Sequence, residues 1–250
     1  MLTENRLLAA LPQEVLERLA PHLQLVALQA GTRLHEAGET IQALYFPIDC
    51  GLSITITMSD GRTAETGLTG KRDVIGINAI MGGCTTTQTA YVVQLPGNAI
   101  KINANVLLDE FDSNKAVRDV LLRYTQALIA QLSQTTACNS LHPLEQRLAR
   151  WLLEAHDRVD KKNLRLTHEL LSEMLGVRRA GVTQAAQKLQ ESGFIQYGRG
   201  SVHILDLPAL EEFACECFRT VKDEYDRLIV PRQRLSRDNQ AIRNSQQALA

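Results

Sequence analysis

The sequence predicts an α+β protein with an N-terminal antiparallel β-roll of jelly-roll type, a long helix, and a C-terminal domain. Three observations predict this order. Ten of the fifteen glycines fall between Gly31 and Gly97, among short apolar stretches of strand length. From about 109 to 137 glycine is absent, and apolar residues recur at spacings of four and three. From 167 to 205 the pattern is typical of two helices followed by a hairpin.

The first hundred residues predict two short helices and then strands. Asn5 is a capping residue for RLLAAL, and Pro12 begins PQEVLERLAPHL in a first turn, where its missing N–H does no harm. LSITITM alternates as a half-buried strand does, and Asp60-Gly61 after it predicts a two-residue hairpin turn. Pro96-Gly97 predicts a type II turn. Many short strands with regular turns indicate a small sandwich or barrel.

The segment 109–138 predicts one long helix that mediates dimerisation. A heptad seam runs along it through Val117, Leu121, Tyr124, Leu128, Gln131 and Thr135. A second apolar line widens the buried face, so we expect one face to pack on the β-roll and the seam to meet a second copy. Because the seam is short, an amphipathic core helix is the alternative. Pro143 disfavours helix at His142, which makes 138–143 a predicted hinge.

These patterns divide the chain into four parts. We expect a β-roll sensor domain over 1–108, the dimerisation helix over 109–138 and a third domain over 139–229 that ends in one helix from Asp206 to Ile229. The polar, Gln- and Arg-rich residues 230–250 predict a disordered tail.

Charge is distributed unevenly, although the net charge is only -1. Residues 1–138 carry 10 basic and 13 acidic side chains, whereas residues 139–205 carry 10 basic and 7 acidic ones. This asymmetry favours a polyanionic partner for the C-terminal segment. The five cysteines are odd in number and scattered, without a signal peptide or a membrane-spanning apolar run, so we expect a cytoplasmic protein.

Two arginines stand at the start of the second helix of the C-terminal pair. The turn at Gly176 and the hairpin FIQYGRGSVHIL are typical of a winged helix-turn-helix, whose second helix enters the major groove of DNA with its N-terminal end. Positive charge at a helix N-terminus costs about 0.3–1 kcal/mol without a partner. Arg178 and Arg179 therefore favour contact with DNA over a merely solvated helix end.

Each candidate contact has a chemical role. Arginine pairs with both acceptors of a guanine edge, which is worth about 1–3 kcal/mol of discrimination. Thr167 and the free N–H groups of the first helix suit a phosphate, and Arg199 at the glycine-flanked hairpin tip is expected to clamp the backbone. The predicted DNA contacts are Thr167, His168, Arg178, Arg179, Ala180, Gly181, Thr183, Gln184 and Arg199.

This order of elements resembles the Crp/Fnr family of bacterial transcription regulators over residues 5 to 228. AGTRLHEAGETIQALYFPIDCGLSITI is similar to the family's β-roll, QRLARWLL to its first DNA-domain helix, and LTHELLSEMLGVRRAGVTQAAQKLQESGFIQYGRG to its helix-turn-helix. The resemblance implies a homodimer on a near-palindromic operator that recruits or blocks RNA polymerase. Arg179 matches the family's guanine-reading arginine. Ala180 replaces a glutamate and Gly181 a hydroxyl residue, which implies a different target sequence.

The effector of the β-roll is unknown from the sequence. Cyclic-nucleotide-binding members of the family use a glutamate for the ribose hydroxyl and an arginine for the phosphate. This chain has Ile77 and Gln88 at those places, so binding of cyclic AMP in the usual mode is not expected. The candidate residues of a pocket for another ligand are Gly76, Ile77, Asn78, Gln88 and Thr89.

No cofactor or metal site is identified. No N-terminal cysteine cluster offers an iron–sulfur site. Cys215 and Cys217, taken to lie on one helix, are about 200° apart around it and are expected not to chelate. Cys50, Cys84 and Cys138 are interpreted as buried structural thiols rather than redox sensors. Haem ligation by one of the six histidines stays open.

The sequence offers little support for an enzyme. HELLS has Ser172 where a zinc protease motif needs its second histidine, and GLTGKR is too short for a phosphate-binding loop. We therefore expect a regulator without enzymatic activity. The alternative is a sensory ligand-binding module whose winged helix serves protein–protein contacts, and such a module would not bind duplex DNA.

Overall fold

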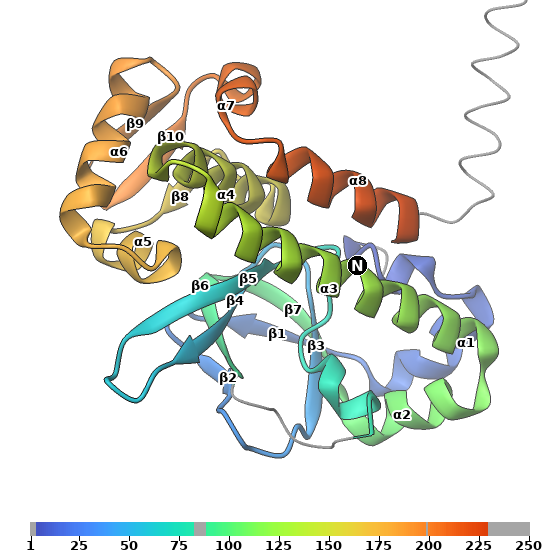
Figure 1. Cartoon of the computed structure of the whole chain (residues 1–250). Helices are drawn as coiled ribbons and strands as arrows, with labels where there is room; N and C mark the ends of the chain where they lie inside the picture. The colour runs from blue at the N-terminus through green and yellow to red at the C-terminus, as the bar shows by residue number, and fades with distance from the viewer. Residues whose placement is uncertain (1–3, 83–88, 199, 230–250) are drawn as a thin grey trace, which may run out of the picture.

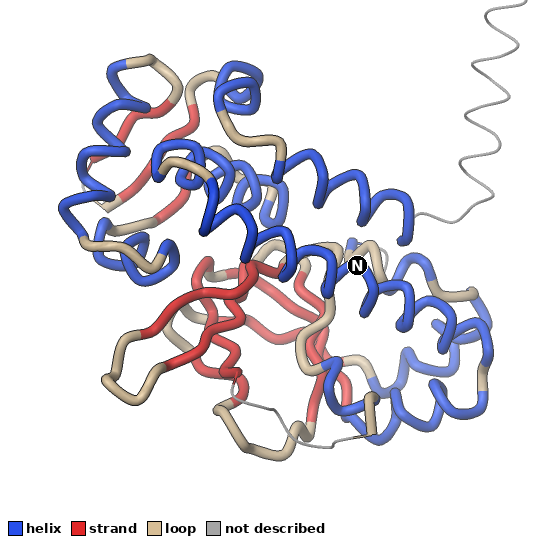
Figure 2. Tube along the Cα trace, in the orientation of Figure 1, coloured by secondary structure: helices blue, strands red, loops and turns tan. Residues whose placement is uncertain are grey.

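The computed structural model of the chain describes residues 4–82, 89–198 and 200–229. In Figure 1 the long helix α3 (Lys115–Leu141) crosses the β-roll, and the C-terminal domain lies at its far end. Figure 2 shows the strands of the roll gathered beneath α3 and a smaller group of strands inside the C-terminal domain. None of the described helices is long and apolar enough to cross a membrane.

Short helices cover the N-terminal end of the β-roll. They are η2 (Leu8–Ala10), α1 (Gln13–Leu19) and η3 (Ala20–His22). Asn5 accepts hydrogen bonds from the backbone N–H groups of Leu7 and Leu8, at 3.0 and 3.1 Å, so it caps the first turn as its sequence position predicts. Leu7 and Leu8 are buried by this turn and join the core of the roll.

The β-roll consists of two antiparallel sheets. Its strands are β1 (Gln24–Leu28), β2 (Arg33–His35), β3 (Ala43–Pro47), β4 (Gly51–Thr57), β5 (Thr63–Thr69), β6 (Thr89–Leu95) and β7 (Gly97–Asn103). One sheet has the order β1-β7-β3 and the other β2-β6-β4-β5. The short helix η4 (Ile77–Ile80) follows β5 in the chain. Inward residues of both sheets fill one core, for example Leu44 and Ile102 of the first sheet and Leu52 and Ile54 of the second.

Two turns differ from the sequence prediction. The β4–β5 hairpin closes with a bond from Met58 N to Arg62 O at 2.8 Å, so its loop has three residues, and Gly61 takes the left-handed conformation at φ 85°. Pro96-Gly97 makes no type II turn: β6 ends at Leu95, β7 begins at Gly97, and the chain passes directly from one sheet into the other. A Cβ on Gly97 would lie 2.6 Å from the Asp49 carbonyl oxygen, and this close approach requires glycine.

The predicted helix 109–138 is two helices in the structure. α2 (Ala104–Ser113) ends before Asn114, whose extended backbone separates it from α3. The side chain of Asn114 accepts bonds from Ala116 N and Val117 N and so caps α3. α3 runs on to Leu141, and His142 is extended before Pro143.

The residues assigned to the dimer seam lie inside the protomer, so that assignment was wrong. Val117, Leu121, Tyr124, Leu128 and Gln131 are all buried, packed between the β-roll and the last helix, α8 (Cys217–Ile229). The amide of Gln131 donates to Leu68 O at 2.8 Å and accepts from Tyr225 and Arg158 at 2.8 and 2.9 Å. The sequence could not reveal that α8 folds back along α3 and covers this line (Figure 1).

The C-terminal domain is a helical layer packed on a three-stranded sheet. Its helices are α4 (Leu144–Val159), α5 (His168–Leu175), α6 (Arg179–Glu191) and α7 (Leu207–Phe213), and its strands are β8 (Asn163–Arg165), β9 (Ile195–Gly198) and β10 (Ser201–Ile204) in the order β8-β10-β9. Val202 of β10 lies opposite both Leu164 and Tyr197.

The helix expected from Asp206 to Ile229 is also interrupted. α7 ends at Phe213, Ala214 is extended at φ -62° and ψ 159°, and α8 begins at Cys217. Cys215 and Cys217 therefore do not lie on one helix, and the expectation that they point in opposite directions was wrong. Both thiols instead join a buried cluster with Cys138.

Candidate nucleic-acid interface

The N-terminal ends of α5 and α6 and the β9–β10 hairpin converge on one face of the C-terminal domain. Leu166 N donates to Gly200 O at 2.9 Å, and the Tyr197 hydroxyl donates to Leu166 O at 3.0 Å, so the hairpin is fixed to the chain that leads into α5. Gly176, at φ 64°, makes the turn between α5 and α6. This is the winged helix-turn-helix arrangement that the sequence predicts.

The start of α6 presents cationic side chains to solvent. Arg178 is the N-cap of α6 and Arg179 its first residue, and both are exposed. Within the described residues neither guanidinium forms an ion pair, whereas Lys188 near the other end of α6 is paired with Glu145. Val182, Ala185, Ala186 and Leu189 form the buried face of α6. The opposite, exposed face carries Arg179, Ala180, Thr183, Gln184 and Gln187.

His168 connects α5, α6 and the wing. Its ring stacks on that of Tyr197 with the centroids 4.2 Å apart. Its Nδ1 lies 3.0 Å from the Thr183 hydroxyl, which donates its proton to Arg179 O at 3.1 Å and so accepts from the imidazole. Burial, and after it the nearby charge of Arg179, lowers the pKa of His168. A neutral His168 therefore stabilises the start of α6 through its hydrogen bond to Thr183, which in turn bonds to Arg179 O.

The other predicted contacts have different surroundings. The hydroxyl of Thr167 accepts from Leu170 N at 3.1 Å and caps α5. A Cβ on Gly181 would meet Leu144 of α4 at 3.1 Å, so this position faces the domain interior. Arg199 lies outside the described residues. Tyr197, which the sequence analysis did not select, carries the wing's contact to α5; its only signal was an aromatic residue in a short strand.

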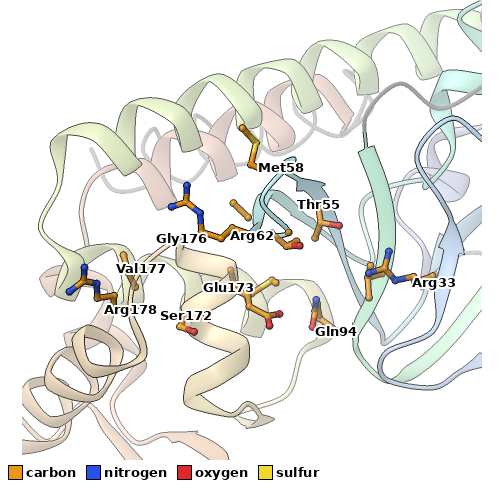
Figure 3. Close-up of a pocket in the computed structure, with 15 residues that line it drawn as sticks. Arg33, Thr55, Met58, Arg62, Gln94, Ser172, Glu173, Gly176, Val177 and Arg178 are labelled. Atoms are coloured by element: carbon orange, nitrogen blue, oxygen red, sulfur yellow. The ribbon is translucent and has the colours of Figure 1, made fainter.

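A cleft of about 910 Å³ separates the β4–β5 hairpin from the helix-turn-helix. Figure 3 shows Ser172, Glu173 and Gly176 of the helix-turn-helix across from the β-roll side chains that line it. Its cationic side chains are Arg33, Arg62 and Arg178. No sequence pattern marked this cleft, because it exists only where the hairpin meets the turn after α5.

The candidate effector residues lie elsewhere in the roll. Gly76 is left-handed at φ 88°, and a Cβ there would meet Ile41 at 3.0 Å. Ile77 is buried in the core, and Asn78 accepts from the Tyr91 hydroxyl at 3.0 Å. Thr89 begins β6 and is half-buried, while Gln88 and Cys84 lie outside the described residues.

Comparisons with known proteins agree with this geometry. Residues 146–213 match the family model described as the Crp-like helix-turn-helix domain. The transcriptional regulator SdrP of Thermus thermophilus is 36% identical over 77 residues, which is 28% of this chain and 38% of SdrP. The matched segment thus spans well under half the length of that relative.

Solved structures extend the likeness to the whole fold. A putative Crp/Fnr-family regulator from Eubacterium rectale superposes with a TM-score of 0.61 at 21% identity, covering 83% of this chain and 96% of that one. FixK2 from Bradyrhizobium japonicum gives 0.66 at 15% identity, covering 77% of this chain and 98% of its own. The chain has the fold of these solved structures, and its C-terminal segment resembles a Crp-like helix-turn-helix domain. The family resemblance and the fold class that the sequence predicts are confirmed.

The chain combines the β-roll, the long helix and the winged helix-turn-helix in the expected order. The matched segment contains α5, α6 and both wing strands, so the convergent face described above lies within the Crp-like domain.

Proposed function

We propose that this chain is a homodimeric transcriptional regulator that binds a specific, near-palindromic DNA site through the start of α6. The observation that carries the proposal is the exposed pair Arg178 and Arg179 at the first turn of a Crp-like recognition helix. Two cations at a helix N-terminus are unfavourable alone, and a guanine edge or a phosphate offsets that cost. Such a regulator acts in the cytoplasm.

Homodimerisation is supported by the outer face of α3. Leu122 and Ile129 lie seven residues apart on this face and are 52% and 57% exposed. Thr125 and Leu132 alternate with them at spacings of three and four, which is the pattern of a two-helix seam. Both are half-buried, and Leu132 packs in part on the β-roll, so they form the inner edge of this face. A twofold pair of α3 helices would present two copies of α6 to half-sites about 34 Å apart. The dimer seam is thus proposed on an exposed face of α3 that lies about 100° around the helix from the buried line through Leu121.

A ligand other than cyclic AMP in the usual mode is proposed for the β-roll. The side chain of Ile77 has no oxygen to accept a hydrogen bond from a ribose hydroxyl, and it packs into the core. Asn78 is already bonded to Tyr91. Calorimetry with cyclic AMP should detect no binding; saturable binding at one site per protomer would contradict this part of the proposal.

Transcription would be controlled through RNA polymerase, which the bound dimer recruits or blocks. An in vitro transcription assay on a selected operator decides the direction. A rise or a fall in transcript, lost with Arg179→Ala, is the expected result; an unchanged transcript at saturating operator occupancy would contradict a role at that promoter.

The decisive experiment is selection of genomic fragments by the purified chain, with and without a cell extract, followed by titration of one selected duplex at several salt concentrations. We expect affinity for the selected site to exceed that for random duplex and to fall steeply with salt, because phosphate contacts release counterions. Failure to bind any duplex at low salt, with extract present, would instead favour a winged helix used for protein contacts.

A further inference from the structure

Three cysteines and one histidine, residue types that commonly bind metals, lie close together where the long helix ends. Cys138 lies in the last turn of α3, His142 follows that helix, and Cys215 and Cys217 come from the junction of α7 and α8. One ligand atom from each lies within 4.8 Å of all the others. The Sγ atoms of Cys138 and Cys215 are 3.5 Å apart, and Sγ of Cys217 is 3.5 Å from Nδ1 of His142.

The local backbone explains why these residues converge. His142 caps the C-terminus of α3, and its backbone N–H donates to Cys138 O at 3.1 Å, which keeps both residues on one side of the end of the helix. The extended Ala214 ends α7, so the Cys-Glu-Cys segment forms an irregular turn and directs both thiols inward. All three cysteines are buried, and the cluster is separate from the cores of the two domains.

The spacing suits a tetrahedral zinc ion. Zinc bonds of roughly 2.3 Å to sulfur and 2.0 Å to nitrogen place the ligand atoms roughly 3.5–3.8 Å apart. The two 3.5 Å separations already fit, and the widest pair would draw in by about 1 Å. Three thiolates and an imidazole are the donor set of closed structural zinc sites, which leave no position open for a substrate.

Neighbouring groups orient these ligands. While Nδ1 of His142 faces the sulfurs, its Nε2 lies 3.4 Å from Oε2 of Glu216, the carboxylate–histidine arrangement that accompanies bound metals. The amide of Gln134 donates to the Cys217 sulfur at 3.1 Å. The charges of Arg147 and Arg150 act on Cys138 and Cys215, and they would balance the excess negative charge of three thiolates around a divalent ion.

We propose that Cys138, His142, Cys215 and Cys217 bind one zinc ion per protomer. The ion would fasten the α7–α8 junction to the end of α3, at the point where the chain enters the C-terminal domain. It would thereby hold α8 along the long helix and fix the exit direction of the segment at His142. No metal site was expected from the sequence, because the two thiols of the Cys-Glu-Cys segment would point in different directions on one regular helix.

The first test is the metal content of the full chain purified under reducing conditions. Elemental analysis should find about one zinc per chain, falling to near zero in Cys138→Ser, Cys217→Ser and His142→Ala. Cys50→Ser is the matched control, since this buried thiol donates to Asn98 O in the β-roll and should leave the zinc content unchanged. If the three ligand variants contained as much zinc as the Cys50→Ser control, the proposal would be overturned. Iron with acid-labile sulfide in place of zinc would overturn it as well.

A second measurement uses the wild-type chain, so it does not require that a ligand variant folds. Metal-free wild-type chain titrated with Co²⁺ should develop thiolate-to-cobalt charge-transfer bands and tetrahedral d–d bands that saturate at one ion per chain and vanish when Zn²⁺ is added. Cobalt spectra typical of octahedral oxygen coordination would overturn the site. Glu216→Gln should weaken zinc binding by about 10–100-fold, as loss of the partner of a ligating histidine does. The exposed Glu212→Gln is its control and should not change affinity.

Discussion

The indole N–H of Trp151 donates a hydrogen bond of 2.8 Å to the carboxylate of Glu65, joining α4 of the C-terminal domain to β5 of the β-roll. The Ser53 hydroxyl donates to the other oxygen of the same carboxylate and lies 3.5 Å from the sulfur of Met174 in α5. A single acidic group, buried between the domains, thus contacts the roll, the first DNA-domain helix and, through Ser53, the helix-turn-helix.

The first prediction is that this junction responds to pH near neutrality. Burial, opposed in part by the two donors, raises the pKa of Glu65 to about 7 from 4.5; Glu154 raises it further and Arg150 lowers it. Because the pKa is raised in the folded state, the contribution to stability is complete below pH 4.5 and is lost as pH rises through about 7. The loss is on the order of 3 kcal/mol.

The sole tryptophan of the chain reports on this change directly. Trp151 fluorescence should titrate with a midpoint near pH 7, and Glu65→Gln should abolish both that titration and the fall in unfolding free energy. Glu14→Gln, at an exposed position on α1, is the control and should keep the titration. Fluorescence that is constant in the wild-type chain from about pH 5 to about pH 9 would refute the assignment.

The second prediction concerns base recognition by α6. Arg179→Ala should cost about 1–3 kcal/mol on the selected operator and relax the preference at one base pair. The control is Arg219→Ala, which removes an exposed arginine that is paired with Glu211 outside the convergent face. Binding curves on operator and random duplex separate the roles: an equal loss on both would make Arg179 a phosphate contact only.

The third prediction distinguishes the two faces of α3. Leu122→Asp or Ile129→Asp should convert the dimer to monomer and weaken binding of the full palindrome, while the circular dichroism spectrum stays native. Leu121→Asp should unfold the protomer instead, since it buries an unpaired carboxylate in the core. Leu25→Asp, at an exposed apolar position on β1, should change neither property. Sedimentation analysis that shows dimers of Leu122→Asp at wild-type affinity would contradict the proposed seam.

The comparison of α3 with α5 and α6 shows what sequence periodicity can predict. The helix-turn-helix was predicted well because Gly176 and the apolar positions around it are local signals. The long helix carries apolar residues on two sides, and which side faces the protomer depends on α8, about a hundred residues later. The lines through Leu121 and Leu122 could therefore not be assigned without the tertiary structure.

The prediction of one continuous helix through the Cys-Glu-Cys segment was wrong for a different physical reason. Helices usually end at glycine or proline, and neither residue occurs between Phe213 and Cys217. The break at Ala214 comes from packing of α7 and α8 on different partners, α4 and α3. A signal did exist in the sequence, since Cys138 and His142 have the i, i+4 spacing of helical metal ligands, but it pairs with Cys215 and Cys217 only through the fold.

The last prediction concerns the buried charges that fix α4 on the roll. Arg158 donates to Gln131, lies 3.5 Å from Asp73, and its guanidinium is 4.8 Å from the ring centre of Tyr225. Removal of the Asp73 carboxylate leaves the charge of Arg158 buried, so Asp73→Ala should lower the unfolding free energy by about 3–5 kcal/mol. Denaturant unfolding measures this, with Asp60→Ala in the exposed β4–β5 loop as the control, expected to change stability by less than about 0.5 kcal/mol. If Asp73→Ala is as stable as Asp60→Ala, the ion pair does not hold the two domains together.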